Sequence, residues 1–204
     1  PTSEFLPAEL ENMAAYVASG GRVLALLDPG FVPQLSKEFR RYGLRVGEDI
    51  VLDDHPSARM MGIDDPSLLL VLPERMRAHP ITEHLRAALV LGIARSVSPM
   101  VDYEGVVSGV GFETSDRGWA EQRIETIPAQ PNPGEDPMGH ISLMGISEIV
   151  DPAVIGVGQT SDKDENGSLL FEDVTLRAGG RVVVIGDSDF AMNTLVSLGN
   201  NQDL

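Results

Sequence analysis

The chain has 204 residues, a formal net charge of −16, 42% hydrophobic residues and no cysteine. This length and apolar content fit one folded domain, and its core must be mainly aliphatic because aromatic residues make up only 5%. An excess of 31 acidic over 15 basic residues argues against nucleic-acid binding and against electrostatic docking onto anionic lipid, because both need clustered cations. The absence of cysteine excludes disulfides, thiolate nucleophiles and cysteine-ligated metal sites.

Apolar runs in this chain are too short for a membrane-spanning helix. The longest, from Ala87 to Ala94, falls far short of the roughly 20 residues that a spanning helix needs. The chain begins at Pro1 rather than at a methionine, so we expect a fragment of a longer protein whose anchors or targeting signals lie outside it.

The first half of the chain predicts helices that alternate with short aliphatic strands. Leu10, Met13, Ala14 and Val17 recur at helical spacing, and Gly20-Gly21 ends this first helix. In chain order, the elements expected next are a strand over residues 22–27, a helix over 31–42, a strand over 50–52 with residues 44–46 leading into it, a polar loop over 53–66, a strand over 67–72 and a helical turn over 81–85. Residues 87–94 fit a helix or a strand, and their position before residues 95–96 favours a strand.

The second half is richer in predicted strands and in proline. Four prolines within residues 127–139 predict a flexible loop. The polar triplet at 187–189 is expected to open a final helix. Strands are expected over residues 106–113, 141–146, 154–157, 169–176 and 182–185.

Aliphatic strands that alternate with amphipathic helices predict an α/β fold in one domain over residues 1–204. We expect a mostly parallel central sheet flanked by helices, with a β-rich and Pro-rich insertion in the second half. In such sheets, ligands bind at the carboxyl ends of the strands. Polar residues that follow the predicted strands are therefore the expected lining of one ligand-binding cleft: Asp28, Arg95, Ser96, Thr114, Ser115, Asp187, Ser188 and Asp189.

Arg95 is expected to matter most in this cleft, because a guanidinium that follows an apolar run needs an acceptor. We expect Asp28 or Asp187 to provide that acceptor when no ligand is present. Ordinary helix capping and turn formation are the alternative explanation for each of these polar residues taken singly.

Catalytic and metal-binding patterns are not evident. The chain has no Gly-x-Ser-x-Gly elbow, and its four histidines have no recognisable serine partner. Asp187 and Asp189 have the chemistry of a glycosidase pair or a magnesium site, but residues two apart at a helix start usually point in different directions. We therefore assign no catalytic residue, no metal ligand and no cofactor.

One acidic segment is similar to a calcium-binding loop. It begins at Asp162 and places Asp173 at the twelfth position, where a bidentate glutamate is usual. No flanking helices are predicted, and Asn166-Gly167 is a common hairpin turn, so a solvated hairpin is the simpler interpretation. Whether the segment binds calcium stays open.

Several strings together resemble a known family over nearly the full length of the chain. They are Gly-Gly-Arg-Val-Leu-Ala-Leu-Leu-Asp-Pro at 20–29, Asp-Ile-Val-Leu-Asp at 49–53, His-Pro-Ile-Thr at 79–82, Ala-Arg-Ser-Val at 94–97, Glu-Thr-Ser at 113–115 with Trp-Ala-Glu at 119–121, and Arg-Val-Val-Val-Ile-Gly-Asp-Ser-Asp-Phe at 181–190. The chain resembles the soluble domain of GldG-like auxiliary proteins of ABC-type uncharacterised transport systems. This domain is shared with gliding-motility proteins and with an intraflagellar-transport protein.

The resemblance implies a fold similar to flavodoxin-like or class I glutamine amidotransferase-like domains. It also implies an extracytoplasmic, periplasmic-side domain held by membrane anchors outside this fragment. The implied partners are ABC transporter membrane or ATPase subunits, with a sugar or other polar small molecule as a ligand. The amidotransferase nucleophile is a cysteine, which this chain lacks, so the resemblance does not bring a hydrolytic role with it.

We therefore predict a non-catalytic ligand-binding or protein-interaction domain of a membrane-anchored, transporter-associated protein. A hydrolase-like enzyme that acts on a polar small molecule or glycan is the first alternative. A structural spacer that holds partner proteins together is the second.

Overall fold

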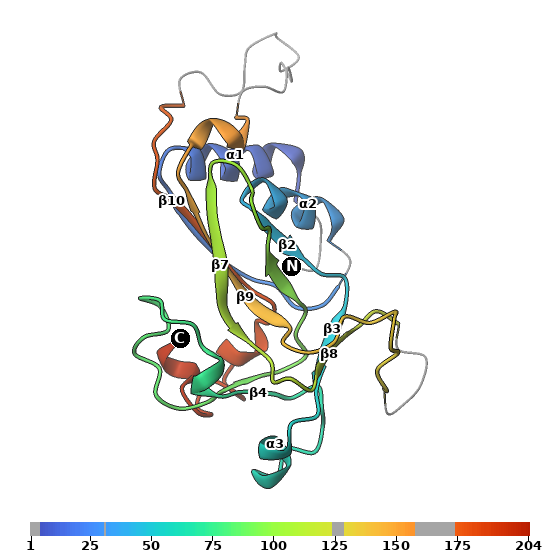
Figure 1. Cartoon of the computed structure of the whole chain (residues 1–204). Helices are drawn as coiled ribbons and strands as arrows, with labels where there is room; N and C mark the ends of the chain where they lie inside the picture. Colours follow the sequence, from blue (N-terminus) through green and yellow to red (C-terminus); the bar gives the residue numbers. More distant parts are fainter. Residues whose placement is uncertain (1–4, 31, 124–128, 158–173) are drawn as a thin grey trace.

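A mixed four-stranded sheet forms the centre of the computed structural model, which describes residues 5–30, 32–123, 129–157 and 174–204 (Figure 1). The strand order is β1-β10-β9-β7. β1 pairs with β10 in parallel, whereas β9 is antiparallel to both of its neighbours. β1, β10 and β7 therefore run in one direction and β9 runs in the other. The bounds are β1 Arg22–Leu26, β10 Gly180–Ile185, β9 Ser142–Ile149 and β7 Val106–Glu113.

The expected mostly parallel sheet flanked by helices is wrong, and so is the flavodoxin-like or amidotransferase-like architecture. The strands expected at 106–113 and 141–146 form β7 and β9 of the central sheet, and β9 runs antiparallel to both β10 and β7. Parallel neighbours need a crossover connection, usually a helix, between consecutive strands. Among the strands of the described part of the chain, only β1 and β10 pair in parallel.

Three short antiparallel ladders extend from this sheet. The two strands that the sequence did not predict, β6 and β8, contain Ser, Pro and Gly and lack an alternating apolar pattern. The ladders are β2 Leu44–Val46 with β6 Val97–Pro99, β3 Ile50–Asp53 with β8 Gly118–Glu121, and β4 Leu69–Val71 with β5 Leu89–Leu91.

The described residues contain three α-helices. α1 (Pro7–Ala18) and α2 (Pro33–Arg41) confirm the two helices expected there, and each begins with a proline in its first turn. Arg41 links them, because its guanidinium lies 3.1 Å from Glu11 of α1 and 3.1 Å from Glu38 of α2. α3 (Pro56–Met60) lies in the segment expected to be a polar loop. None of the described helices combines the length and the apolar character that crossing a bilayer requires.

β10 is buried on both faces, as its unbroken aliphatic sequence predicts. Val182 and Val184 belong to a core cluster that also contains the buried faces of α1 and α2. Val183 and Ile185 belong to a second cluster that contains residues of the β4–β5 ladder. One sheet therefore has helices packed on one face and a small β-ladder on the other.

Two expected elements differ in the described structure. The strand predicted at 154–157 is a 3₁₀ turn over Pro152–Ile155. The predicted C-terminal helix is a 3₁₀ turn over Asp189–Ala191, followed by further turns up to a second 3₁₀ turn over Asn201–Asp203. Serine, threonine and asparagine are frequent in this stretch, and their side chains compete with helical hydrogen bonds.

Some predictions fall wholly or partly outside the described residues. The calcium-loop segment lies outside, as does most of the strand expected at 169–176. Within the Pro-rich segment, the Asp136 carboxylate accepts hydrogen bonds from the backbone N–H of Asn132 at 2.8 Å and of Gln122 at 3.3 Å. The flexibility of residues 127–139 stays a prediction.

The C-terminal turn is tied to β5 by one buried side chain. Asn201 is 3% exposed, and its amide donates to the carbonyls of Val90 at 2.7 Å and Leu195 at 2.9 Å. Its Oδ1 accepts from the Val90 N–H at 2.9 Å. The side chain therefore satisfies the backbone of an edge strand that would otherwise be buried without partners.

Replacing this asparagine is expected to destabilise the domain. Asn201→Ala leaves buried backbone groups of Val90 unpaired, which costs about 2–3 kcal/mol of the free energy of unfolding. Urea denaturation measures this loss. Asn193→Ala is the matched control, because Asn193 is exposed, and it should change stability by less than about 0.5 kcal/mol. Equal effects of the two substitutions would show that Asn201 does not hold the turn to β5.

Candidate functional site

The carboxyl ends of β1, β10 and β7 lie at the same edge of the sheet, because these three strands run in the same direction. This edge carries Asp28 after β1, Asp187 after β10 and Thr114 after β7. β9 lies between β10 and β7 in the sheet, so Thr114 is separated from the two aspartates by one strand.

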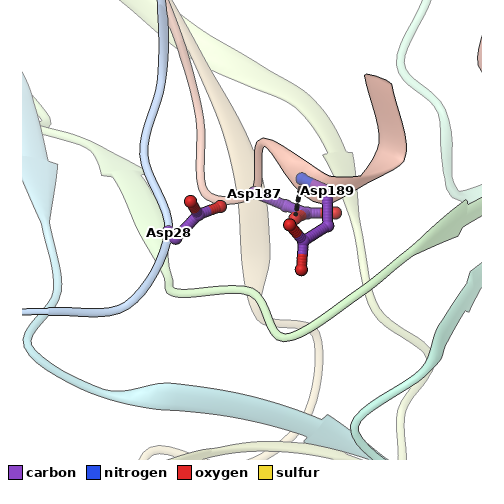
Figure 2. Close-up of side chains that lie close together, drawn as sticks. All are labelled: Asp28, Asp187 and Asp189. Carbon is purple, nitrogen blue, oxygen red and sulfur yellow. Dashed lines mark hydrogen bonds between the residues drawn. The ribbon is translucent and has the colours of Figure 1, made fainter. Parts of the chain in front are cut away.

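Three aspartates gather where β1 and β10 end. Each of Asp28, Asp187 and Asp189 places a carboxylate oxygen within 4.8 Å of the others, and Figure 2 shows the three side chains converging. Most of these oxygens already accept hydrogen bonds from the chain. Asp187 accepts the N–H of Gly92 at 2.8 Å and that of Asp189 at 2.7 Å. Asp28 accepts both the N–H of Ser188 at 2.6 Å and its hydroxyl at 2.7 Å.

Asp187 is fully buried, and its burial raises the pKa of the carboxyl above its ordinary value. The negative charges of Asp189 and Asp28 raise the pKa further, while the two backbone N–H donors oppose the shift.

The backbone after β10 lies close to the backbone at residue 95. A Cβ on Gly186 would lie 2.0 Å from the carbonyl oxygen of Arg95, so only glycine fits where β10 ends against residue 95.

Arg95 is also fully buried, and its guanidinium is largely unsatisfied. One nitrogen, Nη2, donates to the carbonyl of Gly30, whereas Nε and Nη1 have no hydrogen-bond partner. Burial lowers the pKa of Arg95, and the carboxylates of Asp49, Glu48 and Asp28 oppose that shift. The expected ion pair with Asp28 or Asp187 is not formed within 4 Å among the described residues; a backbone carbonyl takes its place.

The same hydrogen-bonded unit occurs three times in and around this edge. In each case one aspartate carboxylate accepts both the N–H and the hydroxyl of a serine that is distant in sequence, and we call this unit an Asp–Ser clasp. Besides Asp28 with Ser188, Asp49 accepts from Ser96 at 2.8 and 2.7 Å, and Asp53 accepts from Ser115 at 2.8 and 2.6 Å. The partners are separated by 160, 47 and 62 residues, respectively.

The eight predicted site residues thus fall into three groups. Asp28, Asp187, Ser188 and Asp189 lie together. Arg95 and Ser96 are adjacent in sequence, and Arg95 lies close enough to Asp28 for that carboxylate to raise the pKa of the guanidinium. Ser115 binds Asp53, while the Thr114 hydroxyl donates to the Gly139 carbonyl at 3.1 Å and accepts from the Ile141 N–H at 2.9 Å. No hydrogen bond between described residues joins this third group to the aspartate cluster. A ligand-binding role for the eight residues stays a prediction.

A large cleft opens beside α2. Its volume is about 1010 Å³, and Ser96 is the one residue of the predicted eight that lines it. Three cations and three carboxylates contribute to the walls, which come from α2, β2 and the segments around β7 and β8. The charged residues that line it are Lys37, Arg40, Arg45, Glu48, Asp49 and Glu113.

Comparison with known proteins identifies the family of this chain. The family described as "ABC-type uncharacterized transport system" matches residues 1–204. The chain belongs to this family. Among solved structures, the "mmIFT52 N-terminal domain" is similar, with a TM-score of 0.60, 14% sequence identity, and coverage of 100% of this chain and 69% of that chain. No curated protein shows a significant match. The family resemblance seen in the sequence is confirmed, and the structural neighbour agrees with a domain shared with an intraflagellar-transport protein.

In this member of the transport-auxiliary family, the serine hydroxyls at the sheet edge form hydrogen bonds within the domain. The hydroxyls of Ser96, Ser115 and Ser188 all donate to carboxylates. Within the described ranges, no histidine ring bonds to a serine hydroxyl. A hydroxyl that donates to a carboxylate without an imidazole base lacks the arrangement that activates a serine nucleophile.

Sequence reasoning missed Asp49 and Asp53 as partners at this edge. Asp53 ends β3, and the rule that selected Asp28 after β1 also applies to it. It was assigned instead to the acidic loop that follows. Asp49 precedes β3, and only the three-dimensional pairing with Ser96 shows its role.

Arg95 is expected to cost stability rather than provide it. Arg95→Met keeps much of the buried volume and removes a guanidinium with two unsatisfied nitrogens. The free energy of unfolding should therefore stay unchanged or rise by about 1–2 kcal/mol, although one hydrogen bond is lost. Chemical denaturation of the wild type and the variant measures the difference. A loss of more than about 2 kcal/mol would mean that the charge of Arg95 is well compensated in the folded state.

Proposed function

We propose that this domain is a non-catalytic interaction module that binds a subunit of an ABC-type transport system. Membership of the transport-auxiliary family supports the association with such a system. The proposal includes an extracytoplasmic position next to the membrane, with anchors supplied by other parts of the protein. The observation that carries the proposal is an exposed apolar projection at α3.

α3 projects from the lower end of the molecule, away from the central sheet (Figure 1). Met60, its last residue, is 88% exposed and Met61 is 64% exposed. We call these two side chains the methionine knob. Large exposed apolar side chains on a projection are a common feature of protein-binding surfaces, where methionine adapts its shape to the partner.

The knob is held firmly at its base. Pro56 occupies the first turn of α3, and the Nδ1 of His55 accepts a hydrogen bond from the Ser57 N–H at 3.2 Å. Ala58 is buried against Leu70 of β4 and Val90 of β5. A projection with a packed base loses less conformational freedom when a partner binds it.

Acidic residues flank the knob in sequence. Asp64 and Asp65 are exposed just after it in sequence, and Asp54 forms an ion pair with Arg59 at its base. The complementary surface is an apolar pocket with a rim of lysine or arginine on the transporter subunit. The acidic surroundings disfavour anionic lipid as the partner.

A non-catalytic role is supported by the sheet edge. Its serine hydroxyls and most of its carboxylate oxygens are consumed by the Asp–Ser clasps and by backbone N–H groups. These groups hold loops against strands, and few of the hydroxyls and carboxylates remain free to take part in a hydrolytic reaction.

Charging the knob is expected to abolish the association. In cells that express the full-length protein, we expect Met60→Glu with Met61→Glu to reduce co-purification of ABC transporter subunits at least tenfold, because two buried glutamates cost far more than the lost contacts. Val101→Glu with Met192→Glu is the matched control, since these side chains are 85% and 50% exposed and lie outside the knob. The proposal fails if the knob variant is folded and still recovers the same subunits as the wild type.

A further inference from the structure

We propose that the cleft beside α2 is a binding site for a small organic anion that carries carboxylate or phosphate groups. This inference does not rest on the transporter association, because the cleft lies on α2 and β2 rather than on the methionine knob. It rests on unpaired cations and on the state of the carboxylates in the same cleft.

Three cations of the cleft lack partners among the described residues. Lys37, Arg40 and Arg45 make no ion pair and no side-chain hydrogen bond there, although the sequence contains 31 acidic residues against 15 basic ones. Lys37 and Arg40 are three residues apart on α2 and so share one helix face. Arg45 is the exposed central residue of β2, between two buried ones. Unpaired cations gathered at one cleft of a strongly acidic domain favour an anionic ligand.

The carboxylates of the cleft are mostly engaged with the protein itself. Both oxygens of Asp49 accept from Ser96 in an Asp–Ser clasp, and Glu113 pairs with Arg77 at 2.6 Å. Glu48 is exposed at the surface. The cations are therefore freer to meet a ligand than the carboxylates are, so an anion fits this cleft better than a cation does.

Size and charge favour a small ligand. A cleft of about 1010 Å³ lies at the upper end of the range for small-molecule sites. The net charge of −16 repels an extended polyanion, whereas screening over a Debye length of roughly 8 Å limits the effect of the distant carboxylates on a small anion. An acidic peptide that binds along the cleft is the competing outcome of the test below.

Isothermal titration of the 204-residue chain with glucose 6-phosphate, citrate and neutral glucose tests the proposal at 50 and 300 mM salt. We expect at least one of the two anions to bind saturably and more weakly at high salt, and we expect glucose not to bind. Lys37→Gln with Arg40→Gln should weaken binding of the anion at least tenfold. Arg22→Gln with Arg177→Gln removes two exposed cations outside the cleft and should leave the affinity unchanged.

Three results would overturn the proposal. One is the absence of saturable binding of either anion at millimolar concentration. Another is equal weakening in the cleft pair and the control pair, which would indicate general electrostatic attraction. The third is binding of an octaglutamate peptide, lost in the cleft variant, when neither small anion binds. Thermal unfolding of each variant checks that it is folded. All four substituted cations are exposed, so we expect their replacement to leave the fold intact.

Discussion

The Asp–Ser clasp is the interaction on which the arrangement of this domain depends. A carboxylate that accepts both the N–H and the hydroxyl of one serine fixes two chain segments in one relative orientation, through hydrogen bonds that a charged acceptor strengthens. The three clasps join residues 28 to 188, 49 to 96 and 53 to 115. They connect the end of β1 to the turn after β10, and they tie both ends of β3 to the segments that precede β6 and follow β7. Short ladders of three or four residues have few hydrogen bonds of their own, so these clasps supply the register that the ladders lack.

The clasps also determine which surfaces of the domain remain available for binding. The sheet edge, where an α/β domain would hold its ligand, is occupied by internal hydrogen bonds, and Arg95 is left buried with two unsatisfied nitrogens. The exposed features that remain available are the methionine knob and the cleft beside α2. The first is apolar and is flanked in sequence by acidic residues, and the second holds unpaired cations. A single domain of the transport-auxiliary family thus offers two chemically different surfaces to its surroundings.

Local patterns in the sequence predicted elements better than they predicted topology. The buried strand β10 and the helices α1 and α2 follow from residue spacing, and β7 was predicted with its observed bounds. The prediction of a mostly parallel sheet was wrong because strand direction depends on the pairing between β7 and β9. These strands lie about 35 residues apart in sequence, and the sequence of neither one identifies its partner. Phe112 of β7 and Leu143 of β9 are fully buried, so both strands contribute to the core.

The polar residues show the same limit. The rule that acidic and hydroxyl residues after strands gather at one edge places Asp28 beside Asp187 and Ser188, as the structure does. It did not indicate that serines consume the carboxylates, because the pairing of Asp53 with Ser115 depends on the ladder between β3 and β8. Nor did it find the cleft beside α2. Lys37 and Arg40 are ordinary surface residues in the sequence, and only the absence of partners in three dimensions distinguishes them.

A double-mutant cycle on the buried clasp tests the central claim most directly. Asp53 and Ser115 are 4% and 6% exposed. Asp53→Ala, Ser115→Ala and the double variant, measured by urea denaturation, should give a coupling free energy of about 1.5–3 kcal/mol. Asp65 with Ser67 is the reference, because it has the same chemistry in an exposed setting, and it should couple by less than about 0.5 kcal/mol. Equal coupling in the two pairs, or none at Asp53 and Ser115, would contradict the account in which these clasps hold the ladders to the sheet.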